Sequence, residues 1–506
     1  MPTTVPPPVL SPEDFLWGLT LLAPILTVVG TAVVVLLLDL LAPDWTSRRF
    51  LMWVSALGLL VALGFVAWLA QIGEQRPSAF GGFLVMDSFA LFFQLVFLLA
   101  ALLVILSAST FMDRQEQFEG EFYTVLLFST SGLMLLAAAN ELMSIYLSLE
   151  LSSLSLAFLA AWNKRERVAA QGLKSTEAGI KFFLLSAMSS AVLLYGMALL
   201  YGLTGATTLS DVSRALTRDL PPTAMPAALL SISMLVAGFG FKIAAAPFQL
   251  WTPDVYQGAP TPATAFFSVA SKAGGFAVIL RIFNGALPDI SLEWSALFGV
   301  LAFVTMTVGN LIAIVQTNIK RLMAYSSITH VGYMLIGLAA ASNFGSSGVM
   351  YYLLAYAFTN LAAFIVIVIM ARYAPDDEIV GYAGLARRSP ALALGLTAAL
   401  LSLAGIPPFV GFFAKLYLFL AAIERASPGL NFLVIWAVIM SAISLYYYGR
   451  VIHAMWMRDP VQTAPVRTGF SQAIALAASV VGVLFVGLLA APFLSAAQVA
   501  ANALAR

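Results

Sequence analysis

The stretch FGFKIAAAPFQLWTPD, residues 239–254, places a lysine and a proline close together inside a long apolar run. Lys242 is followed five residues later by Pro247, and the apolar segment around them extends over residues 224–256. A straight helix of this length would measure roughly 50 Å, whereas the hydrocarbon core of a bilayer is about 30 Å thick. Because proline removes a helical hydrogen bond and clashes with the preceding turn, this segment is predicted to be a broken helix.

The rest of the chain has the composition of an integral membrane protein. Of its 506 residues, 61% are hydrophobic and 10% are charged, whereas soluble domains contain roughly 45–50% apolar residues. Helices must be the spanning elements, because lipid offers no partner for backbone N–H and C=O groups. Apolar stretches recur from end to end and leave no room for a soluble domain. We therefore predict an all-α, polytopic protein that forms a single transmembrane domain over residues 1–506.

Fourteen membrane spans are predicted from the hydropathy pattern. Span 12 is also too long for a straight crossing and contains Pro407 and Pro408, so spans 7 and 12 are both expected to be discontinuous. The predicted spans cover residues 15–41, 49–71, 87–110, 121–139, 141–162, 178–203, 224–256, 262–284, 290–315, 322–342, 347–373, 389–423, 430–456 and 468–492.

The two predicted breaks lie five spans apart, so the broken helices should run in opposite directions across the membrane. This arrangement is typical of inverted repeats, in which the transport pathway lies near the interface between the repeats. We expect the first repeat to be spans 4–8, about 121–284, and the second to be spans 9–13, about 290–456. The flanking spans lie within 15–110 and 468–492.

Basic residues are distributed unequally between the two sets of loops. Loops after odd-numbered spans contain fourteen basic residues, whereas loops after even-numbered spans, together with the C-terminus, contain five. By the positive-inside rule, the odd-numbered loops are predicted to be cytoplasmic and both termini to face outward.

Several function classes are disfavoured by composition. A net charge of +1 argues against nucleic-acid binding, and the absence of cysteine excludes disulfides, thiolate zinc sites and iron–sulfur clusters in this chain. Two histidines are too few for a metal cage. The sequence contains no phosphate-binding loop, dinucleotide fingerprint or nucleophile elbow, so we expect no covalent chemistry in this chain.

Ionisable residues inside the predicted spans are the candidate functional groups. Lys242, Lys272 and Lys415 would together cost roughly 7–10 kcal/mol at about 2.5–3.5 kcal/mol for each central charge, so they must be paired, hydrated or functional. Glu150, near the middle of span 5, is the predicted ion-pair partner of Lys242, and separation of the pair would let the lysine release a proton. His330 adds a group that titrates near neutral pH. A row of such groups in lipid indicates a proton relay.

Each of these residues also has a purely structural interpretation. Glu150 could be a protonated core residue, and Lys272 could pair with backbone carbonyls. Lys415 could extend its ammonium group to the membrane surface. His330 could be a hydrogen-bonded structural histidine.

Three further basic residues lie in or near the predicted spans. Lys181 follows Glu177 by four residues, the spacing of an ion pair on a helix surface, and it could equally be a relay at the inner mouth. Arg281 and Arg450 lie near span ends and are expected to reach lipid headgroups or to line a mouth.

Three long motifs resemble a known family. The segments FKIAAAPFQLWTPDVYQGAPTPATAFFSVASKAGGFAVILRIF (241–283), KRLMAYSSITHVGYMLIGLA (320–339) and LAGIPPFVGFFAKLYLF (403–419) closely resemble the antiporter-like subunit N of bacterial respiratory complex I, the proton-pumping NADH:quinone oxidoreductase. The resemblance covers nearly the whole chain. It implies a subunit of the bacterial inner membrane that translocates protons, driven by electron transfer elsewhere in the complex.

The same resemblance implies cofactors and partners. Quinone, NADH, flavin and iron–sulfur clusters are expected in partner subunits, and no cofactor is expected in this chain. The expected partners are the neighbouring antiporter-like subunit M, small membrane subunits and lipids, with no nucleic acid.

The resemblance also implies roles for individual residues. Glu150 and Lys242 would be the modulating ion pair, Lys272 the central relay and Lys415 the outward exit.

Two more residues match the family, and one departs from it. Lys181 matches a further relay lysine, and His330 a histidine on the connecting path. Gln249 stands where family members usually have a histidine, and we expect it to act as a hydrogen-bond post. The motif WTPDVY (251–256) differs from the form typical of the sibling subunits L and M and of the sodium/proton antiporters, which favours subunit N.

Two other functions are compatible with these residues. A subunit of a multisubunit cation/proton antiporter would lack redox partners, so copurification with flavin- and iron–sulfur-bearing subunits distinguishes it. A non-conducting scaffold would hold neighbours and lipids, and neutralising Glu150 and Lys272 together would then change stability without changing proton flux.

Overall fold

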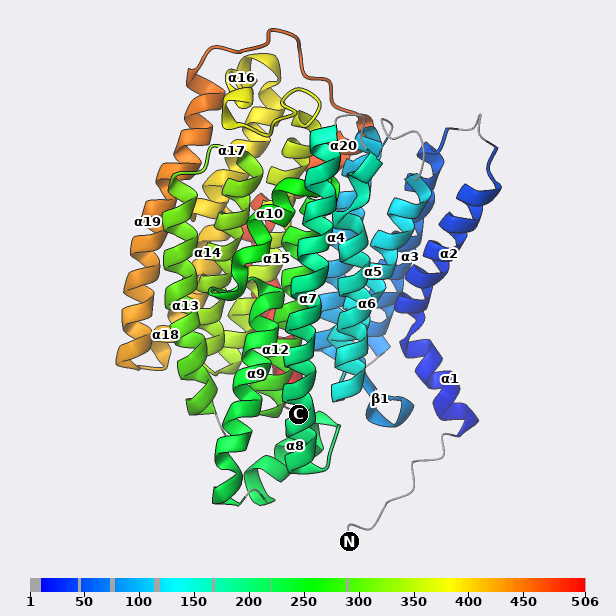
Figure 1. Ribbon diagram of the computed structural model, residues 1–506, viewed down its shortest axis with the longest axis vertical. Coiled ribbons are helices and arrows are strands. Elements are labelled where there is room, and N and C mark those ends of the chain that lie inside the picture. The colour runs from blue at the N-terminus through cyan, green and yellow to red at the C-terminus, as the bar shows by residue number, and fades with distance from the viewer. Residues whose placement is uncertain are drawn as a thin grey trace.

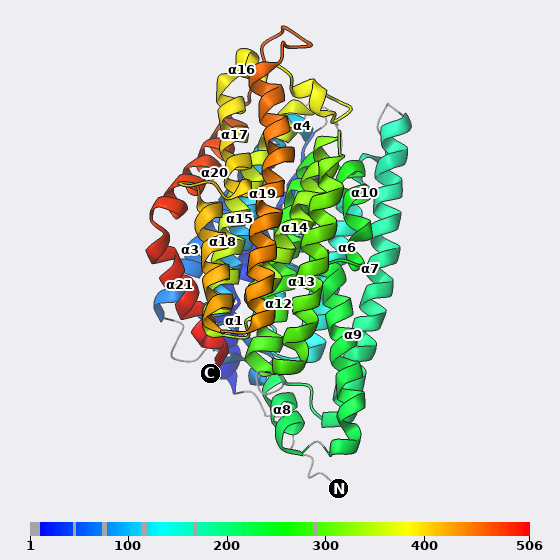
Figure 2. The ribbon, with the colours of Figure 1, turned by 90° about the vertical axis from the view of Figure 1, so that its left-hand side faces the viewer.

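The computed structural model describes residues 11–43, 47–72, 78–112, 119–165, 169–219, 221–287 and 291–505. Long helices run roughly antiparallel to one another and pack into one bundle (Figure 1). The view from the side places α7 (Ala169–Thr204) at one edge of the bundle and α20 (Phe470–Leu488) with α21 (Ala490–Asn502) at the opposite edge (Figure 2).

The remaining helices and short turns follow the predicted spans closely. In the region of spans 1 to 5 the helices are α1 (Pro12–Leu21), α2 (Ala23–Leu41), α3 (Arg49–Ile72), α4 (Ser88–Met112), α5 (Glu119–Ala138) and α6 (Leu142–Ala160). In the region of spans 7 and 8 they are α9 (Met225–Ile243), α10 (Trp251–Gly258), α11 (Thr261–Phe266), η7 (Phe267–Ser271), α12 (Lys272–Ile279) and η8 (Leu280–Ala286). In the region of spans 9 to 13 they are α13 (Ser291–Ile314), α14 (Ile319–Ala339), α15 (Asn343–Met370), α17 (Pro390–Ala404), α18 (Val410–Glu424) and α19 (Pro428–Met457). Short helices and turns elsewhere are η2 (Phe80–Gly82), η3 (Trp162–Arg165), α8 (Leu209–Arg214), η4 (Ala215–Asp219), η5 (Pro222–Ala224), η6 (Phe248–Leu250), η10 (Ile379–Tyr382), α16 (Leu385–Arg388) and η11 (Ala503–Ala505).

The prediction of an all-α, polytopic membrane protein is confirmed. Thirteen helical segments of the described chain are long and apolar enough to cross a membrane. The predicted span at 389–423 is not among these thirteen, because it is divided into α17 and α18, and each of these helices, at 15 residues, is too short to be counted. The only strands in the described ranges are β1 (Ser78–Ala79) and β2 (Leu84–Val85), which pair antiparallel in a loop.

Both long segments with central prolines are interrupted. The helix α9 ends at Ile243, and Ala244 then adopts a left-handed conformation with φ 63°. The helix α17 ends at Ala404, and Gly405 follows with φ 85°, a conformation that glycine adopts without a steric penalty. In Figure 1, α9 lies below α10 and α17 lies above α18, so the two broken helices run in opposite directions.

Two other spans differ from the prediction. Span 1, predicted at 15–41, is interrupted at Leu22, because Pro24 has no N–H to donate to the carbonyl of Thr20. The last ends earlier than expected, at Leu488, and resumes as α21 after Leu489. Pro492 cannot donate to the carbonyl of Leu488, which favours the interruption at this point.

The interior of the bundle is formed by the segment from α11 to η8 and by α14 and α15. These three are buried along almost their whole length, whereas α2, α7, α13 and α19 each expose an apolar face at the periphery. The segment from α11 to η8 contains two π-helical stretches, η7 and η8, on either side of α12. Such turns are rare and occur frequently at functional sites.

Candidate functional site

Lys242 lies near the end of α9, two residues before the left-handed Ala244, and is 7% exposed. Its Nζ donates hydrogen bonds to Ser153 Oγ of α6 at 2.9 Å and to Ser186 Oγ of α7 at 2.8 Å. A third hydroxyl, Ser190 Oγ of α7, lies 3.4 Å away. The broken helix therefore delivers a lysine into a site that is built from hydroxyl groups.

Glu150, the predicted partner of Lys242, reaches it through a hydroxyl group. Its carboxylate accepts a hydrogen bond from Ser190 Oγ, and the same hydroxyl accepts from Lys242 Nζ. Ser190 therefore connects the two charged groups. The pairing of Glu150 with Lys242 stays a prediction, and the intermediate serine was not foreseen because hydropathy carries no sign of which hydroxyl side chains point toward a buried lysine.

A small cavity of ≈ 20 Å³ lies beside Lys242. Its polar lining comes from Lys242, Ser152, Ser153 and Ser271, with Trp251 among the apolar residues around them. This volume suffices for about one water molecule, and hydroxyl groups are suitable partners for it. Ser271 belongs to the turn that immediately precedes Lys272, so the lining of the cavity includes a residue of the segment that carries the second lysine.

Lys272 begins α12 directly after the π-helical turn η7 and is 1% exposed. Its Nζ donates to Tyr256 Oη of α10 at 2.7 Å and to Ser327 Oγ of α14 at 2.9 Å. The alternative in which Lys272 pairs with backbone carbonyls does not describe these contacts. The site instead connects the segment after the first break to the helix that carries His330.

His330 is buried in α14 between two tyrosines. Nδ1 lies 2.5 Å from Tyr352 Oη, and Nε2 lies 3.3 Å from Tyr448 Oη. Tyr448 Oη also forms a hydrogen bond with Ser326, the neighbour of Ser327 along the chain. The partner of Lys272 and the serine that contacts Tyr448 are thus consecutive residues of α14, the helix that also carries the histidine.

Lys415 points into the bundle rather than to the membrane surface and is 5% exposed. Its Nζ donates to the carbonyls of Leu403 at 2.9 Å and Ala404 at 3.1 Å, at the C-terminal end of α17, and to Ser441 Oγ at 2.8 Å. The negative end of a half-helix dipole is a favourable place for an ammonium group. The interpretation in which Lys415 extends to the surface is therefore wrong. Its Nζ also lies 4.8 Å from the ring centre of Tyr333.

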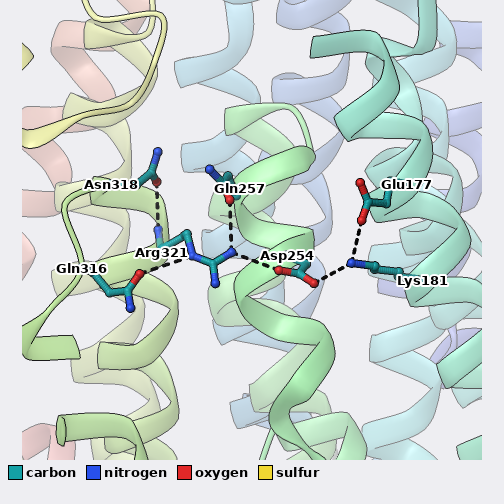
Figure 3. Close-up of polar contacts among 7 residues, drawn as sticks. All are labelled: Glu177, Lys181, Asp254, Gln257, Gln316, Asn318 and Arg321. Atoms are coloured by element: carbon teal, nitrogen blue, oxygen red, sulfur yellow. Dashed lines mark hydrogen bonds and ion pairs between the residues drawn. The ribbon is translucent and has the colours of Figure 1, made fainter. Parts of the chain in front are cut away.

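Lys181 forms the predicted local ion pair and a second one that was not predicted. Nζ lies 2.6 Å from Glu177 Oε1 on the same helix and 2.7 Å from Asp254 Oδ2 on α10. Asp254 also pairs with Arg321 of α14 (Figure 3). The sequence showed an acid three residues after Trp251, but its partners lie on helices distant in the chain.

Arg281 is buried, so of its two expected placements the one that reaches lipid headgroups is wrong. Its guanidinium forms two parallel hydrogen bonds of 3.0 Å with the carboxylate of Asp87, next to the start of α4. It also donates to the carbonyl of Ala137 at the end of α5. The long side chain of Arg281 thus ties η8 to two neighbouring helices.

Gln249 is 8% exposed and lies in the short turn η6 after the first break. Its Oε1 has no hydrogen-bond partner among the described residues, and neither does Oγ1 of the buried Thr252. We expected Gln249 to act as a hydrogen-bond post, but among the described residues no side chain or backbone group donates to its Oε1.

The sequence-predicted residues thus fall into an interior set and a peripheral one. The Ser190 hydroxyl connects Glu150 with Lys242. Lys272 contacts Ser327 of α14, and the adjacent Ser326 contacts Tyr448, a partner of His330. Lys181 lies apart from them, on a more exposed face of α7. Sequence reasoning missed the serines and tyrosines in between, although the clusters YYLLAY (351–356) and YYY (446–448) inside apolar spans were a usable signal. No group of three or more His, Asp or Glu that could hold a metal ion occurs in the described part of the chain.

Comparisons with known proteins agree with this architecture. The family described as NADH:quinone oxidoreductase/Mrp antiporter, transmembrane, matches residues 139–444. The chain is 44% identical over 485 residues to NADH-quinone oxidoreductase subunit N of Trichlorobacter lovleyi, covering 94% of both chains. It is 41% identical over 479 residues to the subunit N of Desulforamulus reducens, covering 94% of this chain and 96% of the relative.

Solved structures show the same likeness. A chain of respiratory complex I from Thermus thermophilus with bound aureothin is 32% identical, with a TM-score of 0.75 and coverage of 93% of this chain and 98% of that one. A chain of the Mrp complex from Dietzia sp. has a TM-score of 0.82 at 22% identity, covering 96% and 97%, which shows a shared fold alone. The chain therefore belongs to the subunit N family of NADH-quinone oxidoreductases.

Proposed function

We propose that this chain is a proton-translocating membrane subunit of bacterial NADH:quinone oxidoreductase, complex I, in the inner membrane. Its relatives are subunits of that enzyme complex. The observation that carries the proposal is the set of three buried lysines, each held by hydroxyl or carbonyl oxygens and none by a direct carboxylate contact.

Hydroxyl partners suit a lysine that gains and loses a proton. A serine or tyrosine hydroxyl accepts from an ammonium group and can also donate to a neutral amine. Lys242 and Lys272 are each surrounded by such groups, so their hydrogen bonds persist in both protonation states. A carboxylate in direct contact would instead favour the charged form strongly and oppose release of the proton.

The contacts support a route for the proton. From Lys242 the proton would cross the cavity near Ser271 to Lys272, whose partner Ser327 lies on α14. From there it would reach Ser326 and the Tyr448 hydroxyl, which contacts His330, and we propose that water bridges the step between the two serines. Lys415 is the proposed exit group, since its ammonium is held at the second break. Glu150 would modulate Lys242 through Ser190, and Lys181 would supply protons from the cytoplasmic side.

The energy for this movement would come from other subunits. Electron transfer from NADH through flavin and iron–sulfur clusters to quinone is proposed to occur outside this chain, which contributes no redox group. The proposed neighbours are the antiporter-like subunit M and small membrane subunits.

Replacement of Lys242 tests the proposal. In complex I purified with Lys242→Ala and reconstituted into vesicles, we expect an assembled complex with strongly reduced proton translocation. Quinone reduction measured with an uncoupler should persist. The control is Lys174→Ala, an exposed lysine on α7, which should translocate protons like the parent. Parental proton translocation by the Lys242 variant would contradict the proposal.

The two alternative functions give different results in related assays. A cation/proton antiporter subunit would copurify without flavin- and iron–sulfur-bearing partners. A scaffold would keep full proton translocation after combined Glu150→Gln and Lys272→Met replacement. The 41–44% identity to subunits N, compared with 22% to the Mrp chain, favours complex I.

A further inference from the structure

A chain of alternating charges lies outside the buried lysine series and joins three helices (Figure 3). It consists of Glu177 and Lys181 on α7, Asp254 on α10 and Arg321 on α14. The two acids and two bases balance each other. Of these four, the proposed route uses Lys181 alone, and Asp254 is the group that the two bases share.

The two oxygens of Asp254 bind different cations. Oδ2 accepts from Lys181 Nζ at 2.7 Å, and Oδ1 accepts from Arg321 Nη1 at 3.0 Å. The carboxylate is 38% exposed, the lysine 40% and the arginine 28%, so water can approach all three. Such exposed pairs are worth about 0–1 kcal/mol each, so they can break and re-form readily.

Each cation also has a second acceptor nearby. Lys181 lies 2.6 Å from Glu177, four residues earlier on its own helix. Arg321 donates to Gln257 Oε1 at 3.1 Å and to Gln316 Oε1 at 3.3 Å. If Asp254 moved away from either cation, that cation would keep a partner. Loss of one contact to Asp254 would thus leave neither cation without an acceptor, which is what a switching contact requires.

Asp254 is located where such a switch would act on the pathway. It lies on α10, the part of the broken helix that follows Lys242 and the break. Among the ion pairs of the described ranges, Asp254–Arg321 is the one that connects the proposed repeats, 121–284 and 290–456. Movement of α10 relative to α14 or α7 would change which cation Asp254 holds.

The position of the cluster along its helices indicates on which side of the membrane it lies. Asp254 lies four residues before the end of α10 at Gly258, and Arg321 two residues after the start of α14 at Ile319. These helix ends lead into loops on the predicted cytoplasmic side. A proton entering from that side would meet Lys181 before it met the buried lysines.

We propose that Asp254 is a positioning residue for proton uptake, which holds the Lys181 ammonium at the cytoplasmic entrance. As the broken helix moves, Asp254 would release Lys181 and keep its contact with Arg321, or the reverse. This inference rests on the proposed function, since it concerns how protons reach the same route. Asp254 itself carries no proton in this scheme. It acts through the location of Lys181 alone, and the tie between α10 and α14 serves to hold Asp254 in the place where it fixes that lysine.

The test uses assembled complex I in vesicles, with proton translocation and uncoupled quinone reduction measured side by side. We expect Asp254→Asn to lower proton translocation several-fold while quinone reduction persists. Asp254→Glu should restore most of the lost rate, because a charge at that place, rather than the exact shape, is needed. The control Asp211→Asn removes an exposed acid paired with Arg214 and should behave like the parent.

A double-mutant cycle separates positioning from a general structural effect. If Asp254 acts through Lys181, Asp254→Asn combined with Lys181→Met should be no worse than Lys181→Met alone. Multiplied effects, a parental rate for Asp254→Asn, or no recovery with Asp254→Glu would each overturn the inference. Should Asp254→Asn fail to assemble, Arg321→Gln provides the same test from the other side of the pair, with the same expected loss, and an unchanged rate overturns it.

The outcomes also separate this inference from the proposed function. If Lys242→Ala abolishes proton translocation and Asp254→Asn does not change it, the function stands and this inference fails. If neither variant changes proton translocation, both fail.

Discussion

At the scale of single residues, the hydrogen-bond partners of the buried lysines differ along the proposed route. Lys242 and Lys272 contact hydroxyl groups, which both donate and accept, whereas Lys415 contacts two carbonyls, which only accept, and one hydroxyl. An ammonium group at Lys415 can donate to all three of these oxygens, whereas a neutral amine keeps only two N–H donors. The first two sites thus suit transfer in both directions, and the third suits the holding of a proton before its release.

The phenol of Tyr448 is predicted to be necessary for transfer to His330, because its hydroxyl contacts both Ser326 and the imidazole. Tyr448→Phe should lower proton translocation by the assembled complex several-fold. It should also cost about 1–3 kcal/mol of stability, since two buried polar groups lose a partner. Proton uptake into vesicles and thermal inactivation of the complex measure the two effects.

The neighbouring Tyr446 provides a matched control for that prediction. It is on the same helix but 61% exposed, so Tyr446→Phe should leave both measurements near the parental values. If the Tyr448 variant translocates protons as well as the Tyr446 variant, the proton does not use this hydroxyl.

The sequence identified the candidate residues at this scale but not their partners. A lysine in an apolar span stands out because its burial is costly, so Lys242, Lys272 and Lys415 could be selected from sequence alone. A serine such as Ser186 does not stand out, because a hydroxyl can satisfy itself on its own helix backbone. Asp254 escaped notice for a different reason, since both of its partners come from other helices.

At the scale of helices, the features that depend on local chemistry were predictable. The spans follow from hydropathy, and the interruptions at Ala244 and Gly405 lie beside Pro247 and Pro407, which cannot continue a helix. The π-helical turn before Lys272 was not predicted, because the residues FSVAS that form it have no distinctive local preference. Tertiary packing against neighbouring helices determines such a turn.

The contact between Arg281 and Asp87 is predicted to be the main tie between η8 and α4. Both side chains are almost fully buried, at 7% and 11% exposed. Arg281→Gln would leave the Asp87 charge buried without its partner, which typically costs about 3–5 kcal/mol. We expect the purified complex to lose this subunit at a lower temperature than the parent, as followed by native gel electrophoresis after heating.

A surface pair gives the comparison for this experiment. Arg214 pairs with Asp211 at 2.6 Å with side chains 66% and 48% exposed, so Arg214→Gln should cost at most about 1 kcal/mol. Equal heat resistance of the Arg281 and Arg214 variants would mean that the buried pair contributes little to holding η8 in place.

At the scale of the whole molecule, the two ends of the bundle are distinct. The helix α16 lies at one end, and α1, α8 and the strand β1 lie at the opposite end (Figure 1). Loops after odd-numbered spans are at the end of α16 and are rich in basic residues, which predicts that this end is cytoplasmic. The outward placement of both termini is part of the same prediction, as is the direction of proton movement from Lys181 toward Lys415.

The orientation can be tested cleanly because the chain has no cysteine of its own. Arg387, in α16, has a side chain 64% exposed, and Asp211, in α8, has one 48% exposed. With a maleimide that cannot cross membranes, Asp211→Cys should react in intact spheroplasts, and Arg387→Cys only after the membrane is permeabilised. Ser55→Cys, at a fully buried position in α3, should react in neither case. Labelling of Arg387→Cys from outside would reverse the orientation, and Lys181 would then lie at the exit rather than the entrance.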